Sequence, residues 1–148
     1  MMREYQILPY RQAYKPEVVD VWERSVLATH HFLVAGDVGL FKSIVEDIDF
    51  SSFPVYCLVY EDAVAGFMGI VDRKLEMLFL APEVFGMGYG RKMMEFAITH
   101  LNVNEVDVNE QNHDAVKFYE KMGFVTYERT EKDSMGKEYP ILKMKLRA

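Results

Sequence analysis

Residues 78–91 read LFLAPEVFGMGYGR, a strand-like run followed by a turn with three alternating glycines and the start of a helical pattern. Gly86, Gly88 and Gly90 have no Cβ atoms, so a ligand can approach the backbone closely. The first N–H groups of the following helix lack partners inside that helix, and the helix dipole adds about half a positive charge there. The segment is therefore predicted to bind an anion.

Other interpretations of this turn stay open from the residues alone. A glycine-rich connection can lack any ligand. A Walker loop needs Gly-Lys followed by Ser or Thr, whereas Gly90 is followed by Arg91. A dinucleotide-binding fold places its glycines after the first strand, and here they lie in mid-chain. Pyrophosphate is the best candidate anion, with Arg91 and Lys92 available for charge-assisted contacts.

The chain on both sides of the turn alternates between helical and strand periodicity. Helical spacing of apolar residues predicts helices over residues 15–30, 40–48, 88–100 and 115–122. Gly36-Asp37 is expected to interrupt the helical pattern between the first two of these helices. Runs rich in β-formers predict strands over residues 4–8, 55–60, 64–71, 74–80, 105–108, 124–130 and 141–146.

This order predicts a mixed α/β (α+β) fold, with a mostly antiparallel sheet of about six to seven strands flanked by four helices. The strand–helix–strand step over residues 74–108 implies a parallel strand pair inside that sheet. A length of 148 residues fits one domain with one core, and no linker or repeat divides the chain. A single domain over residues 1–148 is expected.

Composition limits the classes of partner. The formal net charge of −6 argues against nucleic acid, because proteins that bind it usually carry a basic face. No apolar run approaches the roughly 18 residues of a membrane span, and MMREYQILPY lacks the pattern of a signal peptide. Cys57 is the single cysteine, so no intrachain disulfide can form. A cytoplasmic protein without a membrane partner is expected.

Two segments together resemble the signatures of the GNAT superfamily of N-acetyltransferases. Residues 85–90 resemble its coenzyme A signature, Gln/Arg-x-x-Gly-x-Gly/Ala, with Phe85 in place of Gln or Arg. Residues 112–124 resemble its second signature through Asn112, Ala115, Tyr119 and Gly123-Phe124. Three shorter segments are similar to the YjaB-type branch of bacterial acetyltransferases: residues 25–30, 108–112 and 136–140.

The resemblance implies acetyl-coenzyme A as cofactor. It implies that the strand at residues 74–80 splays from the strand at 105–108 and that the pantetheine arm fills the gap. Asn112 would contact the cofactor, and Tyr119 would lie near its sulfur. Pantetheine and pyrophosphate would contact mainly the backbone of Leu78, Phe79, Leu80, Met87, Gly88, Tyr89, Gly90 and Arg91.

The implied reaction is direct attack by a primary amine on a thioester. A lysine-like amine of pKa about 10.4 is some three units above neutral pH, which costs about 4–5 kcal/mol in reaching the reactive form. Tyr119 is the candidate general acid, since a phenol can protonate the departing thiolate or hydrogen-bond to it. A tyrosine on the apolar face of a helix is also commonly a core residue.

Glu76 is the candidate base, because Glu76, Leu78 and Leu80 share one face of a regular strand. A solvated carboxylate at the strand edge is the competing interpretation. His30 and His31 are rival bases, since the pKa of imidazole lies near working pH. No metal is expected, because neither histidine has a further ligand at useful spacing. Thr29, His30 and Tyr139 are the candidate residues of the acceptor pocket.

The sequence leaves the acceptor open. A small amine or a peptide fits the implied chemistry, and an acidic protein favours cationic acceptors. A non-catalytic module of the same fold that binds or senses acyl-coenzyme A is the alternative function, and Phe85 favours it. A nucleotide-binding domain is disfavoured by the missing Walker lysine. A homodimer through the last strands is a further option.

Overall fold

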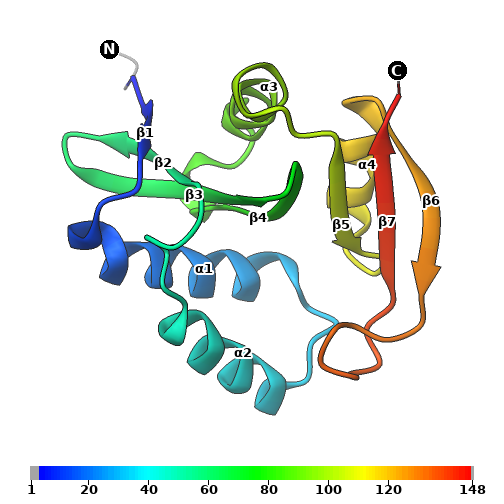
Figure 1. The fold of residues 1–148 in the computed structure, drawn as a ribbon. Helices are drawn as coiled ribbons and strands as arrows, with labels where there is room; N and C mark the ends of the chain where they lie inside the picture. Colours follow the sequence, from blue (N-terminus) through cyan, green and yellow to red (C-terminus); the bar gives the residue numbers. More distant parts are fainter. Residues whose placement is uncertain (1–3, 148) are drawn as a thin grey trace.

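The computed structural model describes residues 4–147, so the two ends of the expected 1–148 domain lie outside the described residues. Short 3-10 turns span Gln12–Tyr14 and Pro82–Val84. The helices and strands follow the order (Figure 1) β1 Gln6–Pro9, α1 Lys15–Thr29, α2 Ala35–Asp47, β2 Val55–Tyr60, β3 Ala63–Val71, β4 Lys74–Leu80, α3 Tyr89–Leu101, β5 Glu105–Asn109, α4 His113–Lys121, β6 Phe124–Thr130 and β7 Ile141–Leu146.

The described strands form one sheet in the order β1-β2-β3-β4-β5-β7-β6. Neighbouring strands run antiparallel except β4 and β5, which are parallel. β4 and β5 pair at Lys74 with Glu105 and at Leu75 with Val106, and they diverge after these two positions. The predicted mixed sheet with a splayed parallel pair is therefore confirmed.

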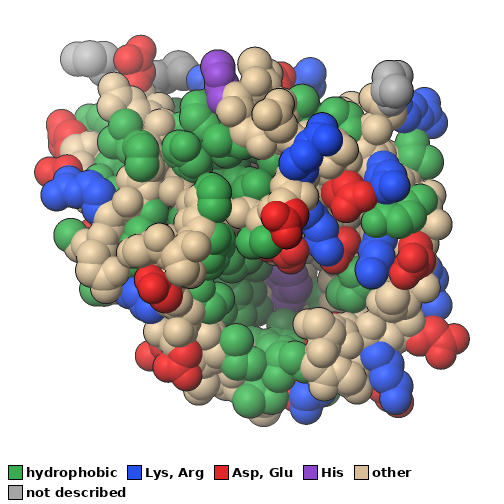
Figure 2. All heavy atoms as spheres, in the orientation of Figure 1, with side chains coloured by type: hydrophobic (Ala, Val, Ile, Leu, Met, Phe, Trp, Pro, Cys, Tyr) green, Lys and Arg blue, Asp and Glu red, His purple; other side chains and the backbone are tan. Residues whose placement is uncertain are grey.

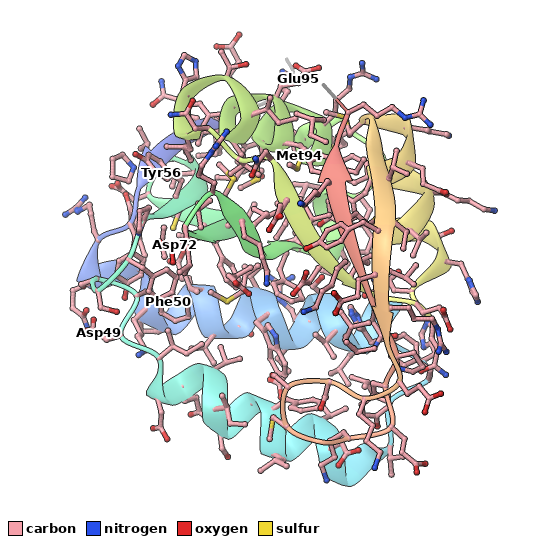
Figure 3. The ribbon with its side chains drawn as sticks, turned by 45° about the vertical axis from the view of Figure 1, so that its right-hand side comes forward. Asp49, Phe50, Tyr56, Asp72, Met94 and Glu95 are labelled. Atoms are coloured by element: carbon pink, nitrogen blue, oxygen red, sulfur yellow. The ribbon has the colours of Figure 1, made fainter. Side chains whose placement is uncertain are left out.

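Helices cover the β2–β4 half of the sheet from two sides (Figure 1). α1 packs against β3 and β4, with α2 next to α1, while α3 lies on the opposite side. Met94 of α3 is fully buried and points toward the sheet, whereas Glu95 is exposed and points outward (Figure 3). α4 packs against β5 and β6. The apolar stripe of each helix thus builds the core that holds the sheet.

The expected interruption at Gly36-Asp37 was wrong, because both residues lie in the first turn of α2. Helix α1 ends at Thr29, and Val34 takes the extended conformation that precedes α2. A carboxylate such as Asp37 is favourable in a first helical turn because it meets the positive end of the dipole. The turn between β2 and β3 forms as expected, with positive φ at Glu61 and Asp62.

β4 carries a bulge at Glu76. Met77 pairs with Gly69 and Leu75 pairs with Ile70, so Glu76 is one extra residue in β4 relative to β3. A bulge interrupts the alternation of side chains along a strand. The argument that Glu76 shares a face with Leu78 by simple alternation was therefore wrong in its geometry.

Gly66 of β3 makes room for the end of β4. A Cβ at this position would lie 2.6 Å from Leu80 Cδ2 and 3.1 Å from the carbonyl oxygen of Phe79. We expect Gly66→Ala to lower the free energy of unfolding by about 1–2 kcal/mol, since the added methyl forces neighbouring atoms apart. Gly39→Ala is the matched control: a Cβ there meets nothing within 4 Å, and alanine should stabilise α2 by about 0.5–1 kcal/mol. Urea unfolding measures both, and equal stabilities for the two variants would contradict the prediction.

Candidate active site

A cleft of about 710 Å³ opens where β4 and β5 diverge, a volume typical of small-molecule sites. Figure 2 shows the molecule hollowed in the middle of this face, with hydrophobic side chains around the opening. The walls come from the end of α1, from β4, from β5, from the glycine-rich turn and from α4. The predicted residues that line it are Thr29, His30, Glu76, Leu78, Phe79, Leu80, Gly88, Gly90, Arg91, Asn112 and Tyr119.

The backbone of β4 is available on the cleft side. Phe79 pairs with Phe67 of β3, and the N–H of Ala81 donates to the carbonyl oxygen of Ala65 at 2.8 Å. Because successive residues of a strand direct their N–H and C=O groups to opposite edges, those of Leu78 and Leu80 point away from β3. β5 has already diverged on that edge. These amides can therefore pair with a ligand that carries amides of its own.

An ion pair holds the two strands at the point where they separate. Lys74 Nζ of β4 lies 2.8 Å from Asp107 Oδ2 of β5 and 3.7 Å from Glu76 Oε1. The hydrogen bond to Asp107 raises the pKa of Lys74, so the ammonium persists at neutral pH. Glu76 thus lies in the cleft wall with its carboxylate about 40% exposed and an ammonium beside it.

The start of α3 presents backbone donors to the cleft. Gly88 precedes the helix with φ +83°, a left-handed conformation that favours glycine. No side chain caps this end, and the N–H groups of the first helical turn, such as those of Gly90 and Arg91, have no acceptor four residues earlier inside the helix. A Cβ at Gly90 would lie 3.6 Å from Leu80 Cδ1, which brings the helix start close to β4. This geometry fits a diphosphate.

Side chains of the turn contribute less than its backbone. The Tyr89 ring is buried with its centroid 5.1 Å from that of Tyr5, and Met87 is 61% exposed. Neither side chain is part of the cleft lining. Arg91 lines the cleft while its Nε lies 3.0 Å from Glu95 Oε1. Phe85 also lines the cleft and is partly exposed.

Helix α4 brings Asn112 and Tyr119 to the same cleft. Asn112 Oδ1 accepts a hydrogen bond from the N–H of Ala115 at 3.3 Å, so Asn112 caps the helix while lining the site. Tyr119 is buried, and burial raises the pKa of its phenol well above the usual value. Its ring packs edge-on against Phe118 at 5.2 Å. The phenol therefore stays protonated at neutral pH and keeps a proton to donate in a hydrogen bond.

The end of α1 forms the wall that bears the only histidine among the described lining residues. His30 lines the cleft, and burial together with the nearby His31 lowers the pKa of its imidazole to about 4. Thr29 Oγ1 lies 2.7 Å from His30 Nδ1 and donates to the carbonyl oxygen of Ser25 at 2.8 Å. His31 is exposed and lies outside the lining.

Tyr139 lies outside the cleft lining. Its hydroxyl donates to Asp37 Oδ2 at 2.7 Å and accepts from the N–H of Val34 at 3.1 Å. Lys137 Nζ adds an ion pair to Asp37 Oδ1 at 3.1 Å. Tyr139 thus ties the loop between β6 and β7 to the start of α2.

Several lining residues were not singled out by the sequence patterns: Ser25, Asp107, Asn109, Asp114, Phe118 and Lys121. Asp107 and Asn109 alternate with buried Val106 and Val108 along β5, and this period-of-two signal could have placed both on one face of the sheet. Ser25 is a buried polar residue inside an apolar stripe, which is a weak signal for a site. Phe118 was visible only as a core residue of its helix.

The described residues hold no group of three His, Cys, Asp or Glu side chains that could bind a metal ion. Likewise, none of the helices in residues 4–147 is long and apolar enough to cross a membrane.

The fold and the cleft define a class, namely enzymes that take an acyl group from coenzyme A, since strand amides, helix N–H groups and a protonated phenol meet in one cavity. A family model described as an acetyltransferase (GNAT) domain matches residues 37–147. The chain therefore belongs to the GNAT acetyltransferase family, and it is an N-acetyltransferase.

Comparison with individual proteins gives the same result. The chain is 37% identical over 129 residues to peptidyl-lysine N-acetyltransferase YjaB of Salmonella typhimurium, covering 86% of this chain and 88% of the relative. The YjaB of Escherichia coli is 39% identical over 132 residues, covering 86% and 87%. The solution structure of apo YjaB from Escherichia coli matches with a TM-score of 0.88 at 36% identity, covering 96% of this chain and 97% of the other.

The cofactor is acetyl-coenzyme A, and structures of the same fold have been solved with coenzyme A or acetyl-coenzyme A. The residues present here fit it. The backbone of Leu78 and Leu80 would hold the pantetheine arm, and the N–H groups of Gly90 and Arg91 at the start of α3 would hold the diphosphate. When bound, the cofactor supplies a thioester carbonyl to be attacked and a thiolate as leaving group.

A substitution at the helix start tests the diphosphate site. We expect Gly88→Val to weaken coenzyme A binding at least 10-fold, because the side chain occupies space above the N–H groups. Gly136→Val is the control: its φ of +78° matches the +83° of Gly88, neither position has atoms within 4 Å of a Cβ, and Gly136 lies outside the cleft. Both variants should carry a similar backbone strain of about 1–3 kcal/mol. Calorimetric titration measures the affinity of each variant for coenzyme A. Equal affinities for Gly88→Val and Gly136→Val would show that the diphosphate does not bind at the helix start.

Proposed function

We propose that this chain acetylates the ε-amine of lysine side chains in peptides or proteins, with Tyr119 as the acid and the cleft between β4 and β5 as the cofactor site. The supporting observation is that β4 amides, the start of α3 and the Tyr119 phenol line one cavity. The lysine acceptor is supported by the two relatives named peptidyl-lysine N-acetyltransferase, each more than a third identical to this chain.

Tyr119 acts at the leaving group. Its buried phenol has a raised pKa, well above that of a thiol, which is about 8.5. Complete transfer of the phenolic proton is therefore uphill, whereas a hydrogen bond to the sulfur strengthens as negative charge develops in a water-poor site. This hydrogen bond helps the thiolate to leave, and Tyr119 does not have to become a tyrosinate.

Glu76 remains the base predicted from the sequence, and its place in the cleft wall supports that role. The ammonium of Lys74 lies 3.7 Å from Glu76 Oε1 and would compete with an incoming amine for this carboxylate.

A module that binds acyl-coenzyme A without turnover is the second candidate. It is favoured by Phe85, which carries no hydrogen-bonding group at the position where the family pattern has Gln or Arg. Binding without thiol release on every amine would support the module, and release would support the enzyme. A cytoplasmic location, one domain over residues 1–148 and a homodimer stay predictions alongside either function.

A panel of acceptors tests the lysine assignment. We expect thiol release from acetyl-coenzyme A with a peptide that has an internal lysine and a blocked N-terminus. Spermidine and a lysine-free peptide with a free N-terminus should react at least 10-fold more slowly. Mass spectrometry locates the acetyl group on the peptide. Faster turnover of spermidine or of the free N-terminus would assign a different acceptor.

Tyr119→Phe tests the acid. We expect kcat to fall about 100-fold or more, in the range for loss of an acid catalyst, while coenzyme A affinity changes little because the ring is retained. Tyr14→Phe is the control, since Tyr14 is also a buried tyrosine but lies outside the cleft. A Tyr119→Phe enzyme as fast as the Tyr14→Phe enzyme would remove the phenol from the mechanism.

A further inference from the structure

His30 sits in the cleft between aromatic rings. The centroid of its imidazole ring lies 5.3 Å from that of the Phe32 ring and 6.4 Å from that of the Phe79 ring of β4. His30 is also the residue that follows the last turn of α1, where its N–H donates to the carbonyl oxygen of Val26 at 2.8 Å. The backbone and the neighbouring rings therefore limit the positions that the imidazole can take.

A short chain of hydrogen bonds selects one tautomer of this ring. The Thr29 hydroxyl has one proton, which it donates to the carbonyl oxygen of Ser25 at 2.8 Å. Thr29 Oγ1 is then an acceptor toward His30 Nδ1 at 2.7 Å, so Nδ1 carries the ring proton. Nε2 is left with its lone pair, the state that a base requires.

The two carboxylates nearest the start of the cleft are engaged by an ammonium. Glu76 is about 40% exposed and has the Lys74 ammonium as a neighbour, while Asp107 accepts a 2.8 Å contact from the same ammonium. The imidazole has no carboxylate beside it, and its burial keeps it neutral above pH of about 4. A neutral ring also does not repel a cationic lysine that enters the cleft.

We propose that His30 Nε2 accepts the proton from the attacking amine and that Thr29 positions the ring for this step. The inference rests on the proposed acetyl transfer to lysine. The amine nitrogen forms a bond to the carbonyl carbon, the carbon–sulfur bond breaks, and its electron pair leaves on the thiolate with Tyr119 as hydrogen-bond donor. The nitrogen, which becomes acidic as it bonds to carbon, passes its proton to Nε2. The imidazolium then returns that proton to solvent.

Chemical rescue tests this role. We expect His30→Ala to lower kcat about 100-fold to 10,000-fold while the KM for acetyl-coenzyme A stays within about threefold. Added imidazole should restore activity, and the restored rate should rise with the pKa of the substituted imidazole used. His30→Gln fills the same space without a basic nitrogen and should be as slow as His30→Ala. His31→Ala, at the exposed neighbour outside the cleft, should keep the parent kcat.

Thr29 provides a second measurement. Thr29→Val removes the hydroxyl that orients the ring and should lower kcat about 10-fold or more, in the range seen when a group that orients a functional histidine is lost. Thr29→Ser retains the hydroxyl and should restore most of the rate. Circular dichroism shows whether each variant is folded, and titration with coenzyme A shows whether it binds the cofactor.

Failure of the proposed function and failure of the His30 assignment give different results. A parent enzyme that acetylates no amine overturns the proposed function, and this inference falls with it. An active parent with an undiminished His30→Ala, or a slow His30→Ala that no imidazole restores, overturns the assignment of His30 alone. Glu76→Gln is measured beside them, and a loss of kcat as large as that of His30→Ala returns the role to Glu76.

Discussion

Two parallel strands that pair at only two positions create the site. β4 and β5 begin side by side, at Lys74 with Glu105 and Leu75 with Val106, and then separate. Strands in a sheet normally satisfy one another's amides, and an unpaired buried amide is costly. The separation therefore leaves amides of β4 facing a cavity, and a ligand with amides of its own is the natural partner. The Lys74–Asp107 ion pair marks where the separation begins.

The rest of the cleft depends on that opening. α3 follows β4 after the turn at residues 81–88, so its start, which no side chain caps, lies beside the part of β4 that has separated from β5. α4 follows β5, and this brings Tyr119 to the other wall. An acidic chain with net charge −6 can still hold an anion, because a helix start acts within a few ångströms and salt screens the distant charges over about 8 Å.

The N-terminal helices complete the site from a distant part of the chain. α1 packs on β3 and β4, so the end of α1 brings Thr29 and His30 against the cleft. Tyr139 links the β6–β7 loop to Asp37 and Val34 at the start of α2. The wall of the cleft at Thr29 and His30 thus comes from the N-terminal part of the chain, whereas β4, the glycine-rich turn and α4 come from later in the sequence.

The sequence by itself determined the elements, the mixed sheet and the anion-binding turn, because periodicity and glycine spacing are local signals that need no distant partner. It also pointed to Asn112 and Tyr119 through a family resemblance. It could not determine the bulge at Glu76, which depends on the register with β3, or the start of α2 at Ala35, which places Gly36 and Asp37 inside the first turn of the helix. Only the tertiary structure decided that Lys74 of β4 pairs with Asp107 of β5 and that His30 at the end of α1 lies beside Phe79 of β4, because these relations depend on how separate elements pack together.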